Sequence, residues 1–122
     1  MRKFNALFFA LALAGLGLFL TTVISVSAGG PPGSVSATVN SGESNMVAFQ
    51  YLKGSDSGPT TPVPLALSVK PKNGTVTFRK TATRTEIFYQ SKKGFTGQDQ
   101  FQFLRTSNDG YAGTYSVAVT VK

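Results

Sequence analysis

The feature that most constrains the fold of this chain is an alternation of apolar and polar residues that returns seven times after residue 33. A period of two is typical of half-buried strands, and no segment of this region keeps the period of an amphipathic helix. The alternating segments are 34–39, 46–52, 64–70, 75–80, 85–90, 100–105 and 114–122. Turn signals separate them, and Asn73-Gly74 is the strongest candidate for a two-residue hairpin. This pattern predicts an all-β, antiparallel β-sandwich of about seven strands.

The aromatic residues within these segments are expected to form the core. Phe49, Phe78, Phe101 and Phe103 occupy alternating positions that should point inward. Burial of one such ring contributes roughly 1.5–3 kcal/mol. The chain has no cysteine, so no disulfide can take over the role of this core.

The N-terminal segment has the composition of a secretory signal peptide. Arg2 and Lys3 precede an uncharged apolar run, and Val26-Ser27-Ala28 offers a cleavage site after Ala28. The sequence therefore predicts a signal peptide at 1–28, a flexible leader at 29–33 and one domain at 34–122, exported to the periplasm or the cell exterior. An uncleaved inner-membrane anchor is the alternative, because 4–28 carries no charge and is long enough to cross a bilayer.

The charge balance favours anionic partners. The chain has 12 Lys and Arg against 5 Asp and Glu. Loss of Arg2 and Lys3 with the signal peptide leaves 10 against 5, a net charge of +5. Such a charge favours binding to acidic polysaccharide or lipid headgroups. The alternative is that it only keeps the protein soluble and has no specific partner. Nucleic acid is not an expected partner of an exported protein.

One positive face is predicted from the basic residues in the middle third of the sequence. It would contact a protein, an anionic glycan or the envelope surface, and the residues are Lys70, Lys72, Arg79, Lys80, Arg84, Lys92 and Lys93. Tyr111 lies in a glycine-flanked turn, which makes it the aromatic residue expected to be exposed for contact.

The residue types argue against an enzyme. The chain has neither His nor Cys, which removes the commonest general base, the thiol nucleophile and the usual transition-metal ligands. The spacing of the five carboxylates brings no two of them together. Calcium needs six to eight oxygen ligands, and Asn108 with Asp109 is better suited to a turn. No cofactor is therefore expected, and a weak calcium site at Asn108 and Asp109 is the unsupported alternative.

A glycine-punctuated stretch, KKGFTGQDQFQF at 92–103, is predicted to be architectural. Gly94 and Gly97 would supply unusual backbone angles, and Phe95 would anchor the loop on the core. Asp99 would accept hydrogen bonds from backbone N–H groups of the 94–97 loop, before an inward-facing strand that begins near Phe101.

These motifs together resemble a known family. PKNGTVTF (71–78), IFYQSKKGFTGQDQFQF (87–103), SNDGYAG (107–113) and TYSVAVTVK (114–122) are similar to the bacterial immunoglobulin-like and cadherin-like repeat modules of surface adhesins. The resemblance implies a seven-stranded immunoglobulin-like sandwich used for adhesion, spacing or protein interaction. Relatives occur in tandem and often bind calcium through acidic junction motifs, which this chain lacks.

Two functional hypotheses follow from the sequence. The first is an exported, non-enzymatic binding or adhesion module of the bacterial envelope. The second is a small structural accessory subunit of an envelope assembly, which docks through an exposed edge strand.

Overall fold

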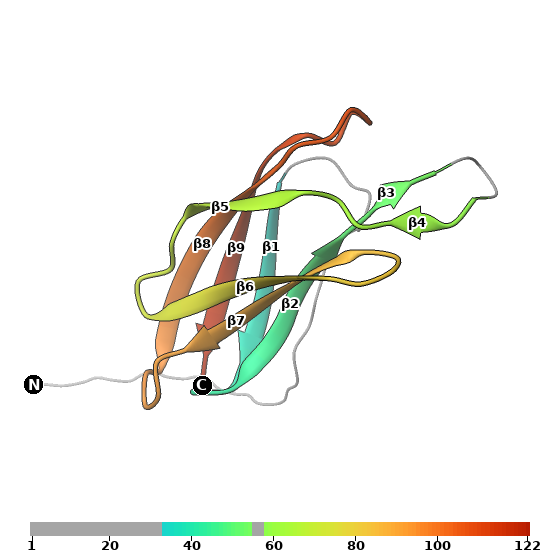
Figure 1. Cartoon of the computed structure of the whole chain (residues 1–122). Coiled ribbons are helices and arrows are strands. Elements are labelled where there is room, and N and C mark those ends of the chain that lie inside the picture. Colours follow the sequence, from blue (N-terminus) through green and yellow to red (C-terminus); the bar gives the residue numbers. More distant parts are fainter. Residues whose placement is uncertain (1–32, 55–57) are drawn as a thin grey trace, which may run out of the picture.

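The computed structural model describes residues 33–54 and 58–122, and within them it contains strands and no helix (Figure 1). None of the described residues belongs to a helix that could cross a membrane. The predicted signal peptide and all of the predicted leader except Gly33 lie outside the described residues. The strands are β1 (Ser34–Val39), β2 (Ser44–Gln50), β3 (Leu52–Lys53), β4 (Thr60–Thr61), β5 (Leu65–Val69), β6 (Gly74–Lys80), β7 (Thr85–Ser91), β8 (Gly97–Arg105) and β9 (Gly113–Val121).

Two larger sheets contain all the long strands. One sheet has the order β1-β9-β8-β5 and the other has the order β2-β7-β6, while β3 and β4 form a separate short hairpin. The predicted all-β class is confirmed. Antiparallel pairing holds throughout these sheets except at β1, which runs parallel to β9 from Ser34 to Val39. The alternation does not predict the β3–β4 hairpin, whose strands are too short to show a period.

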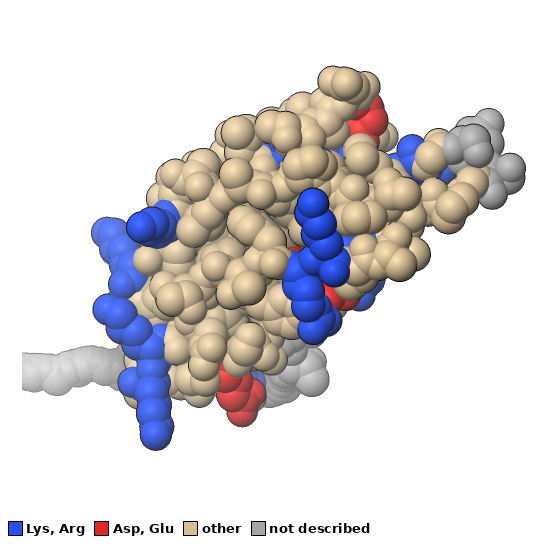
Figure 2. Space-filling model, viewed as in Figure 1, with Lys and Arg blue, Asp and Glu red and all other residues tan. Residues whose placement is uncertain are grey.

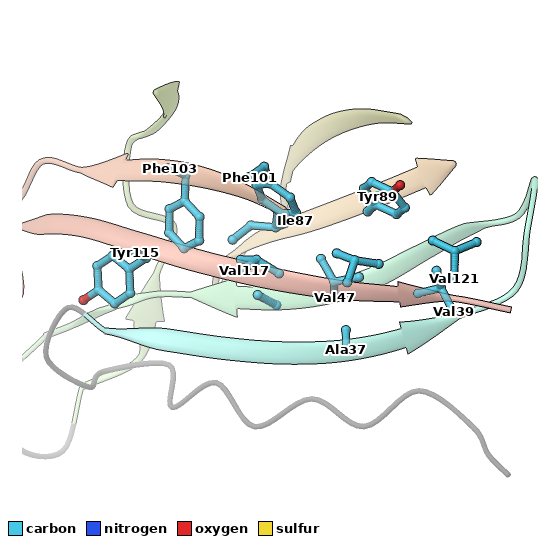
Figure 3. Close-up of a cluster of buried hydrophobic side chains, with 12 residues drawn as sticks. Ala37, Val39, Val47, Ile87, Tyr89, Phe101, Phe103, Tyr115, Val117 and Val121 are labelled. Carbon is cyan, nitrogen blue, oxygen red and sulfur yellow. The ribbon is translucent and has the colours of Figure 1, made fainter. Parts of the chain in front are cut away.

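The core lies between the two larger sheets (Figure 3). Ile87 and Tyr89 reach it from β7, and Phe101 and Phe103 reach it from β8, all with no exposed surface. The Phe103 ring stacks on that of Tyr115 with a centroid distance of 5.1 Å. Alternate residues of β7, β8 and β9 therefore face inward, which is the expected result of period-two patterning.

The prediction that Phe49 points into the core is wrong. The pairing of β2 with β7 shifts by one residue between Met46 and Ala48, which is a β-bulge. Val47 and Ala48 are both buried, and Phe49 pairs instead with Glu86 on the outer side of the sheet. After one extra residue in a strand, each following side chain points to the opposite side of the sheet from the one that strict alternation predicts.

The predicted hairpin at Asn73-Gly74 is also wrong. β5 belongs to the four-stranded sheet and β6 to the three-stranded sheet, so the turn between them crosses from one sheet to the other. Gly74 does not have a positive φ. A Cβ atom at Gly74 would lie 2.6 Å from the Gln90 carbonyl oxygen and 2.7 Å from the Tyr89 ring. Glycine is needed here because the backbone of β6 lies very close to residues 89 and 90 of β7, and not because the turn requires a left-handed backbone.

We expect Gly74→Ala to destabilise the domain by about 1–3 kcal/mol, because overpacking a filled site displaces its neighbours. The control is Thr75→Ala, at the next and exposed position of β6, which should change stability by less than about 0.5 kcal/mol. Chemical denaturation measures both values. Equal stability of Gly74→Ala and the unmodified domain would contradict the close packing of Gly74 on Tyr89.

Candidate functional site

The structure does not bring the predicted basic residues together into one face. Lys70 and Lys72 follow the end of β5, and Lys92 and Lys93 lie in the β7–β8 turn. Arg79 and Lys80 lie at the far end of β6, roughly 17 Å from Gly74 at ~3.3 Å per residue. In Figure 2 the basic side chains on the visible side form separate groups. The prediction of a single positive face is therefore wrong.

Four lysines of the predicted positive face share one end of the sandwich, which we call the lysine end: Lys70, Lys72, Lys92 and Lys93. The backbone N–H of Lys92 donates to the Asn73 carbonyl at 2.8 Å, which joins the β5–β6 and β7–β8 turns. The β1–β2 turn joins them as well, because the Gly42 N–H donates to Ser91 Oγ at 2.8 Å. The turns that carry the four lysines are thus joined to one another by hydrogen bonds and are not independent loops.

The Asp99 carboxylate fixes the position of the lysine end. It accepts hydrogen bonds from the backbone N–H of Lys72 and of Asn73, both at 3.0 Å. The Tyr89 hydroxyl donates to it at 2.7 Å from the opposite sheet, and the Gln100 N–H donates at 2.9 Å. One buried side chain therefore connects β8, β7 and the turn that carries Lys72.

The ionisation of Asp99 depends on these donors. Burial disfavours the charged form, but the hydrogen bonds from Tyr89 and from the backbone of Lys72, Asn73 and Gln100 outweigh burial and lower the pKa of the carboxyl. Burial, reinforced by the bond to Asp99, raises the pKa of the Tyr89 hydroxyl. Asp99 is therefore a charged acceptor and Tyr89 a neutral donor at neutral pH.

The expected partners of Asp99 were different. The sequence predicts donors in its own 94–97 loop, whereas the donors in the structure come from the β5–β6 turn, β7 and Gln100. Asp99 shares the inward face of β8 with Phe101 and Phe103, so its carboxylate points away from the preceding loop. In that loop Gly94 and Gly97 have φ values of 86° and 131°, and half-buried Phe95 packs against the core.

A shallow groove of about 370 Å³ lies beside the lysine end. Two lysines, three side-chain amides, one carboxylate and two apolar side chains surround it, and its lining residues are Val69, Lys70, Lys72, Asn73, Gln98, Asp99, Gln100 and Ala118. The two lysine ammonium groups and the side-chain amides can all donate hydrogen bonds to an anionic group. The Asp99 oxygens are already bonded to four donors.

The charges of the lysine end are not neutralised by described residues. Three ion pairs occur in the described part of the chain, and none includes Lys70, Lys72, Lys92 or Lys93. Two other carboxylates lie near these turns. One belongs to exposed Glu43, which accepts a hydrogen bond from Asn40 at 3.3 Å, and the other is the C-terminal carboxylate of Lys122, whose oxygen accepts from the Ser41 N–H at 3.0 Å. The lysine end thus presents a surplus of positive charge to solvent.

The arginines of the predicted face have a different environment. Arg79 and Arg84 both bind Glu86, at 2.6 and 2.8 Å, on the outer side of the three-stranded sheet. Hydrogen bonds from Arg79 and then Arg84 lower the pKa of the Glu86 carboxyl. The guanidinium groups also lie over aromatic rings, Arg79 over Phe88 at 4.8 Å and Arg84 over Phe49 at 4.4 Å. Because the two guanidinium groups already bind Glu86 and aromatic rings, they have fewer hydrogen-bond donors left to bind an anionic ligand.

Tyr111 lies at the end of the sandwich opposite the lysine end, in the β8–β9 loop, and its side chain is 37% exposed. Its backbone N–H donates to Asp109, and its carbonyl accepts from the Tyr115 hydroxyl at 2.8 Å. The Arg105 guanidinium lies 5.7 Å from the Tyr111 ring centroid. The predicted contact residue is therefore exposed, but it lies far from the lysine end.

Arg105 is a structural residue that the charge pattern does not reveal. Its side chain is fully buried, pairs with Asp109 at 2.5 Å and donates to Gln50 Oε1 at 2.6 Å. It also donates to the Tyr51 carbonyl and to Ser107. The one available signal is the period of two, since position 105 continues the inward face of Phe101 and Phe103. Asp109 and Arg105 together hold the β8–β9 loop.

The described residues contain no group of three or more acidic side chains that could hold a metal ion. Asp99 and Asp109 lie near opposite ends of β8, and each is held by its own set of donors. No protein-family model matches the sequence, and no curated protein sequence matches it significantly. The resemblance to immunoglobulin-like and cadherin-like modules therefore stays a prediction.

We expect the acid stability of the domain to depend on Asp99. Its pKa is lowered on folding, so its contribution is present above the unfolded pKa of about 3.9 and is lost as the pH falls through the folded value. Asp99→Asn should lower the free energy of unfolding at pH 7 and should flatten its decline below about pH 4. Asn40→Ala, in an exposed turn, is the control. An unchanged pH profile in Asp99→Asn would show that the carboxylate charge is unimportant.

Proposed function

We propose that the chain is an exported, non-enzymatic binding module of the bacterial cell envelope, and that its lysine end contacts an anionic envelope polymer. The observation that carries this proposal is the grouping of Lys70, Lys72, Lys92 and Lys93 on turns that share backbone hydrogen bonds, without ion pairs to described residues. Positive charge on a rigid support recognises a polyanion without a deep pocket.

The strand order supports an adhesin-like module. With the long strands lettered A to G in chain order, the sheets contain the neighbours B-E-D and C-F-G, as immunoglobulin sandwiches do. The first strand differs, because β1 lies beside the last strand instead of the second. In such sandwiches the turns at either end carry the contacts, and the lysine end occupies one of these positions.

Binding to alginate, an acidic polysaccharide, tests the proposal. Each lysine near an anionic surface contributes about 1 kcal/mol, so Lys72→Glu/Lys93→Glu should weaken binding at least about tenfold at low salt. The control Lys53→Glu/Lys80→Glu makes the same change of net charge at exposed positions away from the lysine end. Calorimetric titration measures both affinities, with neutral dextran as the control ligand. Equal weakening by the two double variants would mean that only net charge matters.

Export is tested separately, by mass spectrometry of the chain recovered from the periplasm or the medium. Cleavage by signal peptidase should give a product that begins at Gly29. A product that retains residues 1–28 in the membrane fraction would instead support the anchor.

An open side of the sandwich favours the second candidate function, docking through an edge strand. β5 and β6 are the edge strands on this side. Their inward-facing residues are only half-buried, whereas those of β8 and β9 are buried; the half-buried residues are Leu65, Leu67, Val76 and Phe78. An added strand would cover them and would pair with a free edge. Edge docking predicts slower hydrogen exchange of the β5 and β6 amides in a solubilised envelope fraction than in buffer. Equal exchange in both would exclude it.

A further inference from the structure

The outer face of the four-stranded sheet carries no charge. The four strands β1, β5, β8 and β9 contain two charged residues, Asp99 and Arg105, and both side chains are buried on the inner side. The outward positions of β8 are three glutamines, Gln98, Gln100 and Gln102, followed by Leu104. The absence of charge is unusual for an exposed surface, particularly in a chain with a surplus of basic residues.

The neighbouring strands extend this uncharged face. Alternate residues of β9 from Thr114 to Thr120 are threonine, serine, alanine and threonine, and those of β1 are two serines and a threonine. The register places Ser36 beside Ala118 and Ala118 beside Gln100, so the outward side chains form regular rows across the sheet. The other sheet differs, because its outer side carries Arg79 and Glu86.

Exposed apolar residues lie on the same face. Three large apolar side chains of the described residues are exposed, and two of them, Val69 at 48% and Leu104 at 38%, belong here. Val69 pairs with Gln102 after a shift of register in β5, and Ala66 pairs with Leu104. The depletion of charged residues is a property that this face shares with the centre of protein interfaces.

We propose that this uncharged face is a contact surface between two copies of the chain. In a two-fold symmetric contact, each residue near the axis meets its own equivalent. A basic surface such as the lysine end would then oppose like charges, whereas the uncharged face would not. Serine, threonine and glutamine side chains both donate and accept hydrogen bonds, so a surface built from them is complementary to itself.

The dimensions of the face fit a weak dimer. The strands β1, β9, β8 and β5 have 6, 9, 9 and 5 residues, so at ~3.3 Å per residue and ~4.8 Å between strands the face covers on the order of 460 Å² per copy. Two such faces bury on the order of 900 Å² in total, which is the size of a weak, transient contact. Lys70 and Lys72 border one end of the face, so opposed strand directions would keep the lysine ends of the two copies apart.

Sedimentation velocity between about 5 µM and 1 mM tests the proposal on the exported domain in 0.15 M NaCl. The unmodified domain should sediment as a monomer at the lowest concentration and shift toward a dimer at the highest. Ala118→Lys, in the middle of the face, should raise the dissociation constant at least about tenfold, because the contact places two lysines opposite each other. Thr77→Lys adds the same charge to exposed β6 on the opposite sheet and should leave association unchanged.

A second variant and a second measurement guard against misfolding. Gln100→Lys should reproduce the effect of Ala118→Lys, and circular dichroism should show that both variants are folded. In the unmodified domain, amide chemical shifts that change with concentration should cluster at outward residues of β8 and β9. A monomer throughout the concentration range, or equal effects of Thr77→Lys and Ala118→Lys, would overturn the proposal. Binding of a neutral glycan to this face by a domain that stays monomeric would overturn it too.

Discussion

The hydrogen bonds of the Asp99 carboxylate are the interaction on which the arrangement of this domain most depends. A buried carboxylate is costly unless its oxygens are bonded, and here four donors satisfy it. Tyr89 comes from one sheet and Asp99 from the other, so the network fixes the two layers relative to each other. It also fixes the turn that crosses between the sheets, where Gly74 allows the backbone to pass against the Tyr89 ring.

The same network connects architecture to the proposed function. Backbone groups of Lys72 and Asn73 are held by Asp99, and Asn73 in turn accepts from Lys92. The lysine side chains are free to follow an irregular polymer, while their backbones stay in place. At the other end, the buried pair of Arg105 and Asp109 organises the β8–β9 loop. The buried charges of Asp99 and Arg105 fix the turns at the two ends of the sandwich, whereas the proposed polymer contacts use the exposed lysines.

The proposed dimer would give the lysine ends a second property. With opposed strand directions, two lysine ends would face away from each other at the two ends of the assembly. A bivalent particle of this kind gains avidity for a long polyanion without any new contact, because the second binding event becomes intramolecular. In this proposal the uncharged face and the lysine end would serve different steps of one function, association of the copies and attachment to the polymer.

The sequence predicts the strands well, because alternation reports which side of a strand is buried. Phe101 and Phe103 are in the core as expected. Phe49 is not, because a bulge leaves no signature in the pattern of residue types. The hairpin predicted at Asn73-Gly74 is wrong because a glycine after asparagine can serve close packing as well as a hairpin turn. The basic residues were expected together, yet the length of β6 separates Arg79 from Lys72, and Glu86 pairs with two arginines. Such pairings depend on tertiary structure, which local patterns do not contain.

An NMR titration of the ¹⁵N-labelled domain with an anionic oligosaccharide tests the central claim most directly. The account predicts that the largest chemical-shift changes fall on the amides of 70–74 and 91–94, and that they disappear in high salt. Changes centred on the outer side of β6 and β7, or on the β8–β9 loop, would contradict the assignment of binding to the lysine end. Absence of any change at millimolar oligosaccharide would contradict polyanion binding itself.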